Sequence, residues 1–434
     1  MNTLRFFSTI LLLVLLITSS CDQTVNDASE STSDASSTSL DSYAIEGANI
    51  LEFGPGNILF VGDSKNGIVH AIEINSTELK DPVPYNMKRI DQQLAEKLEI
   101  PASELIINDM KVNPYSQEAY IAVKRGHLPG APSFIAVVNP MGQLELLDIA
   151  NTTKSYVEIN NKVNPDYTFW KDIPASSLNI TDIDYHQNHI YVAGLTNGEF
   201  ASNLRKIAYP FTEEQANVGS IEMYHTVHTQ METRAPIRTM LFEELDGEST
   251  LIASYTCTPL VTIPASEIVE GSDIKAKTIA ELGYGNAPVD MVSFMVQEQD
   301  GSYDKKLLIT HKQRGGSVIS LKELAAANKQ EGMQGFTFGP EGKVNIFQIS
   351  TANVIHIDDQ NQMMLLTLRR NIDDGSLELI SKLKGSYFRL SDFISEYNFP
   401  DYEYPAEQEG TKQFHDMVKP LEGYPELTSD KKGD

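Results

Sequence analysis

The sequence predicts an all-β fold, a β-propeller of about six blades, from two observations. First, residues 180–211 read as a meander of three short strands, with alternating or apolar runs at 181–185, 190–193 and 204–209 separated by polar turns. Second, the same pattern recurs about six times along the chain. Its starting points are Asn49, Ile107, Ile180, Pro236, Val289 and Asn353. One unit has too little area to bury a core, so we expect the units to pack around an axis and close. Seven blades is the alternative count, and we expect short helical insertions.

The first twenty residues resemble a bacterial lipoprotein signal. Arg5 precedes an apolar run at 6–17 that is short for a membrane span, and small residues lead to Cys21. We therefore expect 1–20 to be a signal peptide and Cys21 to be the lipidation site, which indicates a lipid-anchored protein of the cell envelope, on the periplasmic side or at the cell surface. An ordinary secretory signal with an incidental cysteine is the alternative. Residues 21–47, rich in Ser, Thr and Asp, are expected to form a flexible tether.

The propeller is expected to span 48–384, with two insertions. Residues 85–98 carry apolar residues at helical spacing, and Pro101 follows. Residues 151–177 form a polar insertion that contains the single tryptophan, Trp170. Residues 385–434 form a C-terminal extension, with a short packed helix at 387–397 and little order beyond Pro400. We expect 42–46 to complete the last sheet as an outer strand, because a ring of strands closes well when both chain ends share a blade.

Charge limits the kinds of partner. With 34 Lys and Arg against 60 Asp and Glu, the formal net charge of -26 argues against a nucleic-acid partner. Against this background, the loops after the second strand of each unit gather charged and polar residues. They are Asp63, Lys65 and Asn66; Lys124, Arg125 and His127; Thr196 and Asn197; Thr256, Cys257 and Thr258; His311, Lys312 and Arg314; Arg369, Arg370 and Asn371. In a propeller these loops open on one face, where a cationic mouth would attract a small anionic ligand. The alternative is that these bases pair with aspartates of the channel and bind nothing.

Polar residues also recur near the start of each predicted inner strand. Aligning the units places Asp109, Asp182, Arg238, Asp290 and Asn353 at equivalent positions. Such side chains either hydrogen-bond the backbone of the neighbouring blade or face water in the channel.

The connection into the fourth unit, residues 224–236, is the most unusual local sequence. It holds His225, His228, Glu232 and Arg234. Two imidazoles and a carboxylate could ligate a divalent metal, with Cys257 or His311 supplied by neighbouring loops. The alternatives are hydrogen-bonded loop histidines, or an acid-base or ligand-contact role. The pair His186 and His189 has the same spacing in a predicted turn and serves as a comparison.

Cys257 is the one cysteine besides Cys21. A thiol beside Arg and His could be a nucleophile of lowered pKa, but unpaired cysteine is more often a small buried apolar residue. No Ser-His-Asp order, phosphate-binding glycine loop or pair of catalytic carboxylates stands out.

Several phrases carry a family resemblance. They are GPGNILFVGDSKNG (54–67), VAGLTNGEFASNLRKIAYPF (192–211), IEMYHTVHTQMETRAPIRT (221–239), YTCTPLVTIP (255–264) and TIAELGYGNAPVDM (278–291). With these phrases the chain resembles exported bacterial β-propeller lipoproteins over residues 48–383. The resemblance implies the fold and the export, and it implies no particular activity.

Two hypotheses of function follow. The first is a binding module that recognises a small anionic ligand or an envelope protein through the loop face carrying His225, Arg238, Cys257, His311 and Arg314. The second is an enzyme with its site in the channel mouth, either a metal-assisted hydrolase or lyase or an oxidoreductase with a quinone-type cofactor.

Overall fold

The computed structural model describes residues 40–75, 80–128, 130–169, 173–198, 201–212, 215–298, 300–351, 353–371 and 373–385. All of them belong to one of the two units into which the chain divides, Ser39–Asp434. The predicted signal peptide, Cys21, Trp170 and the extension beyond residue 385 lie outside the described residues. Among the described residues, no helix has both the length and the apolar character that a membrane crossing requires.

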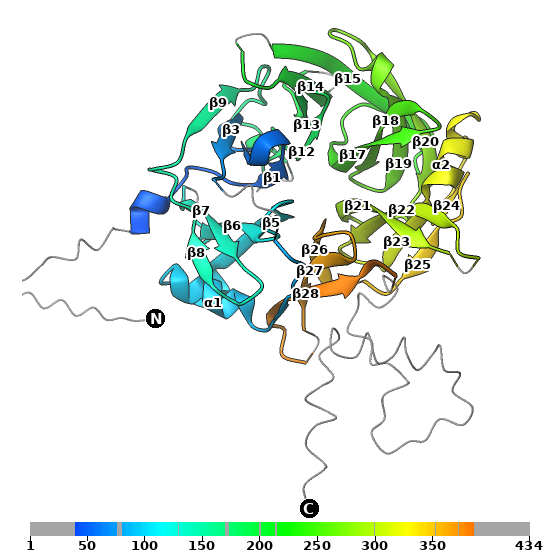
Figure 1. Ribbon diagram of the computed structural model, residues 1–434. Coiled ribbons are helices and arrows are strands. Elements are labelled where there is room, and N and C mark those ends of the chain that lie inside the picture. The colour runs from blue at the N-terminus through cyan, green and yellow to red at the C-terminus, as the bar shows by residue number, and fades with distance from the viewer. Residues whose placement is uncertain are drawn as a thin grey trace, which may run out of the picture. The chain divides into compact units, whose positions relative to one another are not determined.

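The fold is all-β, with sheets in a propeller-like arrangement around a common axis (Figure 1). Four sheets have four strands each. In spatial order they are β1 (Ile50–Phe53), β2 (Ile58–Asp63), β3 (Ile68–Glu73) and β9 (Lys154–Glu158); β5 (Leu105–Val112), β6 (Ala119–Arg125), β7 (Ser133–Val138) and β8 (Leu144–Leu146); β21 (Pro288–Gln297), β22 (Tyr303–His311), β23 (Gly316–Ser320) and β25 (Phe347–Ile349); and β26 (Val354–Asp359), β27 (Met364–Arg370), β28 (Leu377–Leu383) and β4 (Asn86–Met87).

A ten-stranded sheet contains two antiparallel meanders. The first is β12 (Asp182–His186), β13 (His189–Leu195), β14 (Ser202–Ala208) and β15 (Gln215–His225), and the second is β17 (Ile237–Leu245), β18 (Glu248–Tyr255), β19 (Pro259–Pro264) and β20 (Ile274–Glu281). They join through parallel pairing of β15 with β20, and the short strands β16 (Gln230–Glu232) and β24 (Glu341–Gly342) pair with β15 and β20. A separate hairpin consists of β10 (Thr168–Phe169) and β11 (Ile173–Pro174).

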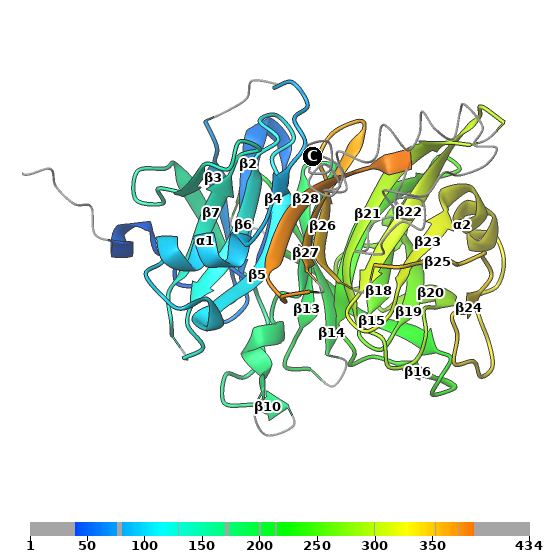
Figure 2. The same ribbon diagram turned by 90° about the horizontal axis from the view of Figure 1, so that it is seen from below.

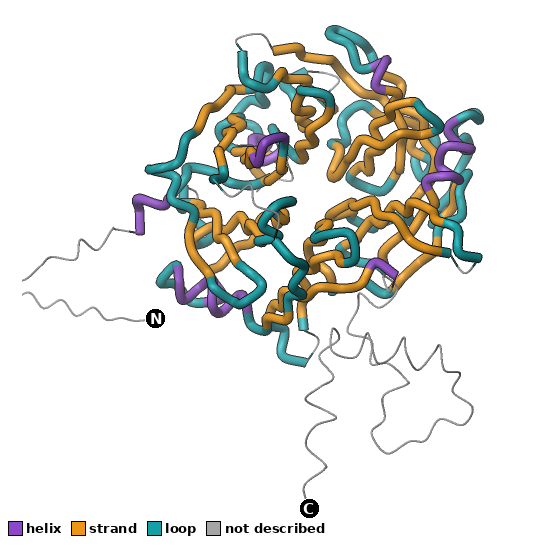
Figure 3. Tube along the Cα trace, viewed as in Figure 1, coloured by secondary structure: helices purple, strands orange, loops and turns teal. Residues whose placement is uncertain are grey.

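The helices are short, and the two α-helices lie at the outer edge of the ring of sheets (Figure 3). They are α1 (Ile90–Lys97), α2 (Leu321–Asn328) and the 3-10 turns Leu40–Tyr43, Pro55–Asn57, Ala102–Glu104, Ala175–Leu178 and Ala265–Glu267. The predicted helical insertion is therefore confirmed over α1, where Ile90 and Leu94 are buried, as their spacing indicated.

The first strands of the meanders form a closed ring, because β1 contacts β12, β12 contacts β17, and the contacts continue through β21, β26 and β5 back to β1. Each predicted starting point lies within two residues of the first residue of one of these strands. The sequence repeat therefore correctly predicted which strands line the central axis.

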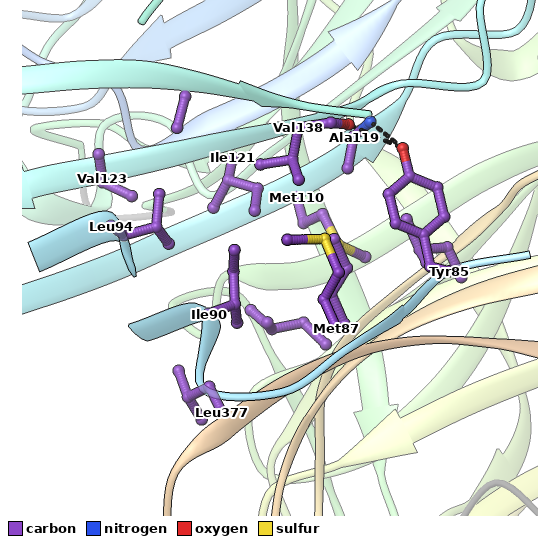
Figure 4. Packing of buried hydrophobic residues seen from close by; sticks show 14 of the residues in the cluster. Tyr85, Met87, Ile90, Leu94, Met110, Ala119, Ile121, Val123, Val138 and Leu377 are labelled. Atoms are coloured by element: carbon purple, nitrogen blue, oxygen red, sulfur yellow. Dashed lines mark hydrogen bonds between the residues drawn. The ribbon is translucent and has the colours of Figure 1, made fainter. Parts of the chain in front are cut away.

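Apolar clusters fill the space between neighbouring sheets. The largest joins the β5–β8 sheet to the last sheet and to α1 (Figure 4). At its edge, the buried Tyr85 donates its hydroxyl hydrogen to the Val138 carbonyl (2.7 Å) and accepts the Ala119 N–H (3.0 Å). The segment before α1 is thereby fixed against the sheet that follows it.

The closure of the last sheet differs from the prediction. Its fourth strand is β4, which pairs with β28 through Met87 and Asn86. The prediction that 42–46 would supply this strand is wrong, since that segment contains the end of a 3-10 turn and Ile45 bridges Ser133 of β7. Burial of Tyr85 and Met87 between two sheets favours the observed pairing, and a two-residue strand is too short to show a period in sequence.

The polar insertion at 151–177 also contributes to a sheet. Its segment β9 pairs with β3 and buries Val157, so it completes the first sheet.

Candidate functional site

Carboxylates on the inner strands link neighbouring sheets. Asp109 accepts the Leu51 N–H (2.7 Å), Asp182 accepts the Met240 N–H (2.6 Å), and Asp290 accepts the Ile357 N–H (3.1 Å). In each case the donor belongs to the next inner strand of the ring. For these three aspartates, the structure shows the linking role that was one of the two sequence-based alternatives.

Two further carboxylates of the inner strands also accept a backbone N–H from the next inner strand. Asp184 accepts the Phe242 N–H (2.8 Å), and Asp358 accepts the Val112 N–H (2.7 Å). Sequence reasoning missed both, although Asp184 lies two residues after Asp182 and therefore on the same face of β12.

Two basic groups lie among these acids. Lys111 Nζ is 2.9 Å from Glu52 Oε2 and 4.0 Å from Asp358 Oδ1. His356 Nδ1 is 3.0 Å from Asp290 Oδ2 and 3.6 Å from Asp109 Oδ1. We call these seven residues, Glu52, Asp109, Lys111, Asp184, Asp290, His356 and Asp358, together with Asp182, the axial cluster.

Acids outnumber bases in the axial cluster, which perturbs its ionisation. Burial, and then the charge of Asp290, raises the pKa of Asp109 to about 6. Burial raises the pKa of Asp358 to about 7 and that of Asp184 to about 8. The group Asp109, Asp290 and His356 has ligand atoms close enough to hold a metal ion. Both carboxylates are already bonded to backbone N–H groups, so we assign the group to sheet linkage.

The other two aligned positions differ from the aspartates. Arg238 is half-buried at a bulge of β17, and its side chain makes no hydrogen bond or ion pair with the described residues. Asn353 lies just before β26, where its carbonyl accepts the Arg370 N–H (2.8 Å).

Bases of the loop face have local partners. Arg125 lies 3.8 Å from Glu99, Arg369 pairs with Glu378 (3.1 Å), and Arg370 donates to the Gly375 carbonyl (2.6 Å). Arg314 donates to the Tyr284 carbonyl (2.9 Å). Within the described part of the chain, Arg125, Arg314 and Arg370 do not pair with the axial aspartates, contrary to the alternative considered for the rim.

The hairpin of β15 and β16 brings His225, His228 and Glu232 together. His225 Nδ1 lies 3.1 Å from Glu232 Oε2, and His228 Nδ1 contacts Glu232 Oε1. The two rings are 4.2 Å apart between centroids. The pairing of Met223 with Glu232 and of His225 with Gln230 explains this, because it places His225 and Glu232 on the same face of the hairpin. We call these three residues the hairpin triad.

The contacts within the hairpin triad shift the pKa values of His225 and Glu232 in opposite directions. Burial lowers the pKa of His225, but the hydrogen bond and charge of Glu232 outweigh this effect and leave the pKa above its ordinary value. Burial likewise raises the pKa of Glu232, but the bonds from both histidines outweigh it and lower that pKa to about 2.

Cys257 contributes its backbone to this region. Its carbonyl lies 3.1 Å from His225 Nε2, so a connection between meanders meets a loop after a second strand, as the propeller geometry predicted. Burial, followed by the charges of Glu281 and Glu232, raises the pKa of the Cys257 thiol. A thiol that is mostly protonated at neutral pH is a poor nucleophile, which argues against the nucleophile hypothesis.

His311 is the last residue of β22 and not part of a loop, and its side-chain hydrogen bonds among the described residues do not include the hairpin triad. Its ring is fully buried, Nε2 lies 3.0 Å from Ser317 Oγ, and burial lowers its pKa to about 4. The described groups able to hold a metal include neither His311 nor Cys257, so the expected extra ligands are not brought to the hairpin triad.

Sequence reasoning missed Glu281, which lies behind the hairpin triad. Its side chain is fully buried, accepts from Thr226 Oγ1 (2.9 Å), the Thr258 hydroxyl and the Gly283 N–H (3.2 Å), and lies 3.9 Å from His225 Nε2. A single glutamate at the end of an apolar strand gave no signal of this role.

Figure 2 shows β10 and β16 on the same side of the molecule. Arg234, which follows β16 in the sequence, lines a pocket of about 210 Å³. Thr196, Asn197 and Tyr167 also line it, and its apolar part comes from Val163, Leu195 and Ala201. The loop after the second strand of the third unit and the polar insertion therefore meet at this pocket.

Comparisons with known proteins identify no family. No family model and no curated protein matches the chain. Among solved structures it is similar to Drosophila Semaphorin 1b, extracellular domains 1-2, at 7% identity and a TM-score of 0.34, over 79% of this chain and 84% of that chain. It is also similar to virginiamycin B lyase from Staphylococcus aureus, at 9% identity and a TM-score of 0.28, over 78% of this chain and 95% of that chain. A third is PorZ, a surface component of the type-IX secretion system of Porphyromonas gingivalis, at 8% identity and a TM-score of 0.27, over 78% of this chain and 37% of that chain. At these scores the likenesses carry no argument. The fold assignment rests on the sheet topology, and the lipoprotein family stays a prediction.

Proposed function

We propose that the protein is a lipid-anchored propeller of the cell envelope that binds a small anionic ligand through its loop face. The ten-stranded sheet then counts as two blades, since its two meanders each begin with a strand of the inner ring, and the total is six. The anchor rests on the signal-like N-terminus and Cys21. Metabolic labelling with palmitate tests it, because a Cys21→Ser variant should lose the label.

The pocket at Arg234 is the observation that carries the binding function. It combines Arg234, an exposed residue that also has an interaction within the protein, the polar side chains Thr196 and Asn197, and a buried apolar floor at Val163 and Leu195. Arginine binds carboxylate and phosphate groups with two parallel hydrogen bonds, and a few placed polar groups over an apolar lining are typical of ligand sites. Its volume of about 210 Å³ lies below the usual range of about 300–1,000 Å³ for drug-sized ligands. We therefore infer a ligand the size of a small carboxylate or a phosphate ion.

Thermal unfolding with added ligand tests this function. We expect one of inorganic phosphate, acetate, succinate or glutamate to raise the melting temperature of the wild-type protein, since a ligand at about 100 times its Kd stabilises the folded state by about 2.7 kcal/mol. Arg234→Ala should abolish the shift. Arg370→Ala is the matched control, because Arg370 is an exposed arginine at the end of β27 that does not line the pocket, and it should keep the shift. Equal loss in both variants would indicate a diffuse cationic rim, and no shift with any probe would contradict the proposal.

A second candidate function is that of a metal-assisted hydrolase or lyase. The observation that favours it is the convergence of His225, His228 and Glu232, a donor set that catalytic zinc sites use. Zinc-dependent cleavage of p-nitrophenyl acetate or bis(p-nitrophenyl) phosphate that disappears in His228→Ala would support it. Absence of turnover by metal-loaded protein on these and related esters would leave the binding function as the assignment.

A further inference from the structure

The hydrogen atoms of the hairpin triad can be assigned from its contacts. His225 Nε2 lies 3.1 Å from the Cys257 carbonyl oxygen, which can only accept, so Nε2 must carry a hydrogen. A neutral imidazole has one N–H, so in a neutral His225 the Nδ1 atom carries no hydrogen and has a free lone pair. That lone pair faces Glu232 Oε2 at 3.1 Å, and the carboxylate is also an acceptor.

Two acceptors at this distance need a proton or a metal ion between them. Either a second proton occupies Nδ1, or a metal ion lies between the imidazole and the carboxylate. The hydrogen bonds of the Glu232 carboxylate among the described residues come only from the side chains of His225, His228 and Gln230, with no backbone N–H. The axial carboxylates differ, because backbone donors already occupy them.

We propose that His225, His228 and Glu232 form a binding site for a divalent transition metal ion such as Zn²⁺. The ligand atoms lie within 4.8 Å of one another. A tetrahedral ion with bonds of about 2.0–2.1 Å holds its ligand atoms about 3.4 Å apart, so the ion requires the ligand atoms to shift by about 1 Å. His228 can make such a shift, because 45% of its side chain is exposed. Three protein ligands leave a fourth position open to water or a ligand.

The surroundings of His225 resemble an outer coordination shell. Histidine ligands of metals usually donate their second N–H to a carbonyl or carboxylate, which fixes the ring, and His225 does so to Cys257. The carbonyl is presented by a loop in which Cys257 has φ +72° and Thr258 has φ +100°. Positive φ is a rare conformation for a β-branched residue. The bonds from Thr226 and Thr258 to the buried Glu281 hold this loop and the hairpin together.

Metal titration of the full-length protein tests the site. After removal of metal with a chelator, Zn²⁺ is titrated by calorimetry in a buffer with excess Mg²⁺, which occupies sites made only of carboxylates. We expect one high-affinity Zn²⁺ per chain. Co²⁺ should give the visible absorption of a four-coordinate site with nitrogen and oxygen ligands.

Variants separate the site from adventitious binding. His228→Ala and Glu232→Gln change partly exposed residues, and each should weaken Zn²⁺ binding by about a hundredfold or more, since outer-shell changes alone cost about 10–100-fold. His189→Ala is the matched control, because His186 and His189 share the same spacing and the His189 ring lies 2.9 Å from the nearby Gln187 carbonyl. It should bind Zn²⁺ like the wild-type protein. Wild-type protein without stoichiometric Zn²⁺, or variants that bind as tightly as wild type, would overturn the proposal and leave a proton as the cation of the hairpin triad.

Discussion

The axial cluster and the hairpin triad contain the same kinds of side chain and use them in opposite ways. In the axial cluster, Asp109, Asp182 and Asp290 each accept a backbone N–H from the next inner strand, so the carboxylates are part of the scaffold. In the hairpin triad, Glu232 accepts only from side chains among the described residues, and one side of the triad is open to solvent through His228. In this protein, a cluster of acids and histidines is therefore a candidate binding site only where backbone N–H groups do not already occupy the carboxylate oxygens.

The two clusters also differ in charge balance. The axial cluster has an excess of buried acids, which raises the pKa values of Asp184 and Asp358. The hairpin triad has two imidazoles around one carboxylate, which lowers the pKa of Glu232. Removing a negative charge should therefore stabilise the first cluster and destabilise the second.

The largest effect is expected at Lys111. Lys111→Met removes the cation that lies between Glu52 and Asp358 and leaves their charges uncompensated. Breaking such a pair from one side is strongly destabilising, and we expect the free energy of unfolding to fall by about 3 kcal/mol in urea titrations at pH 7. Lys275→Met is the control, because the Lys275 side chain is 77% exposed beside Glu222 and should contribute less than about 0.5 kcal/mol. Similar small losses in both variants would show that the axial acids need no cation.

A stabilising effect is expected at Asp184. In the folded protein its pKa is about 8 against an ordinary 3.8, so the stability from this group is fully present below about pH 3.8 and is lost as the pH rises through 8. Asp184→Asn keeps an oxygen acceptor for the Phe242 N–H and removes the charge. We expect the variant to be more stable than wild type at pH 8 and equal to it near pH 4. The measurement is the urea midpoint at both pH values. Asp166 is exposed, and Asp166→Asn should leave the urea midpoint unchanged at both pH values. If Asp184→Asn were less stable than wild type at pH 8, the axial cluster would not have an excess of buried negative charge.

The smallest effect is expected at Glu232 and has the opposite sign. Glu232→Gln in metal-free buffer weakens the charge-assisted bonds from His225 and His228, so the free energy of unfolding at pH 7 should fall by about 1 kcal/mol. Thermal unfolding measures this change. Glu222→Gln on the neighbouring strand β15, where the partner Lys275 is exposed, should change stability by less than about 0.5 kcal/mol. If Glu232→Gln were more stable than wild type, the expectation that loss of a negative charge has opposite effects in the two clusters would be wrong.

Parts of both clusters could be predicted from the sequence. The repeat placed Asp109, Asp182 and Asp290 on inner strands, and the short spacing of His225, His228 and Glu232 suggested a common site. Lys111, His356 and Glu281 could not be predicted, because their partners come from strands that are distant in the sequence. The strand β4 was missed for the same reason, since two residues acquire a strand conformation only from the edge of β28.

The sequence by itself determined the all-β repeat, the inner-strand positions and the local hairpin chemistry, because alternation of apolar residues and short-range spacing are properties of neighbouring residues. Only the tertiary structure decided which acids are bonded by backbone, which segment closes the last sheet, and that His225 points its Nε2 at Cys257. These outcomes depend on which N–H and carbonyl groups of remote strands remain unpaired after the sheets have packed, and no local pattern records that.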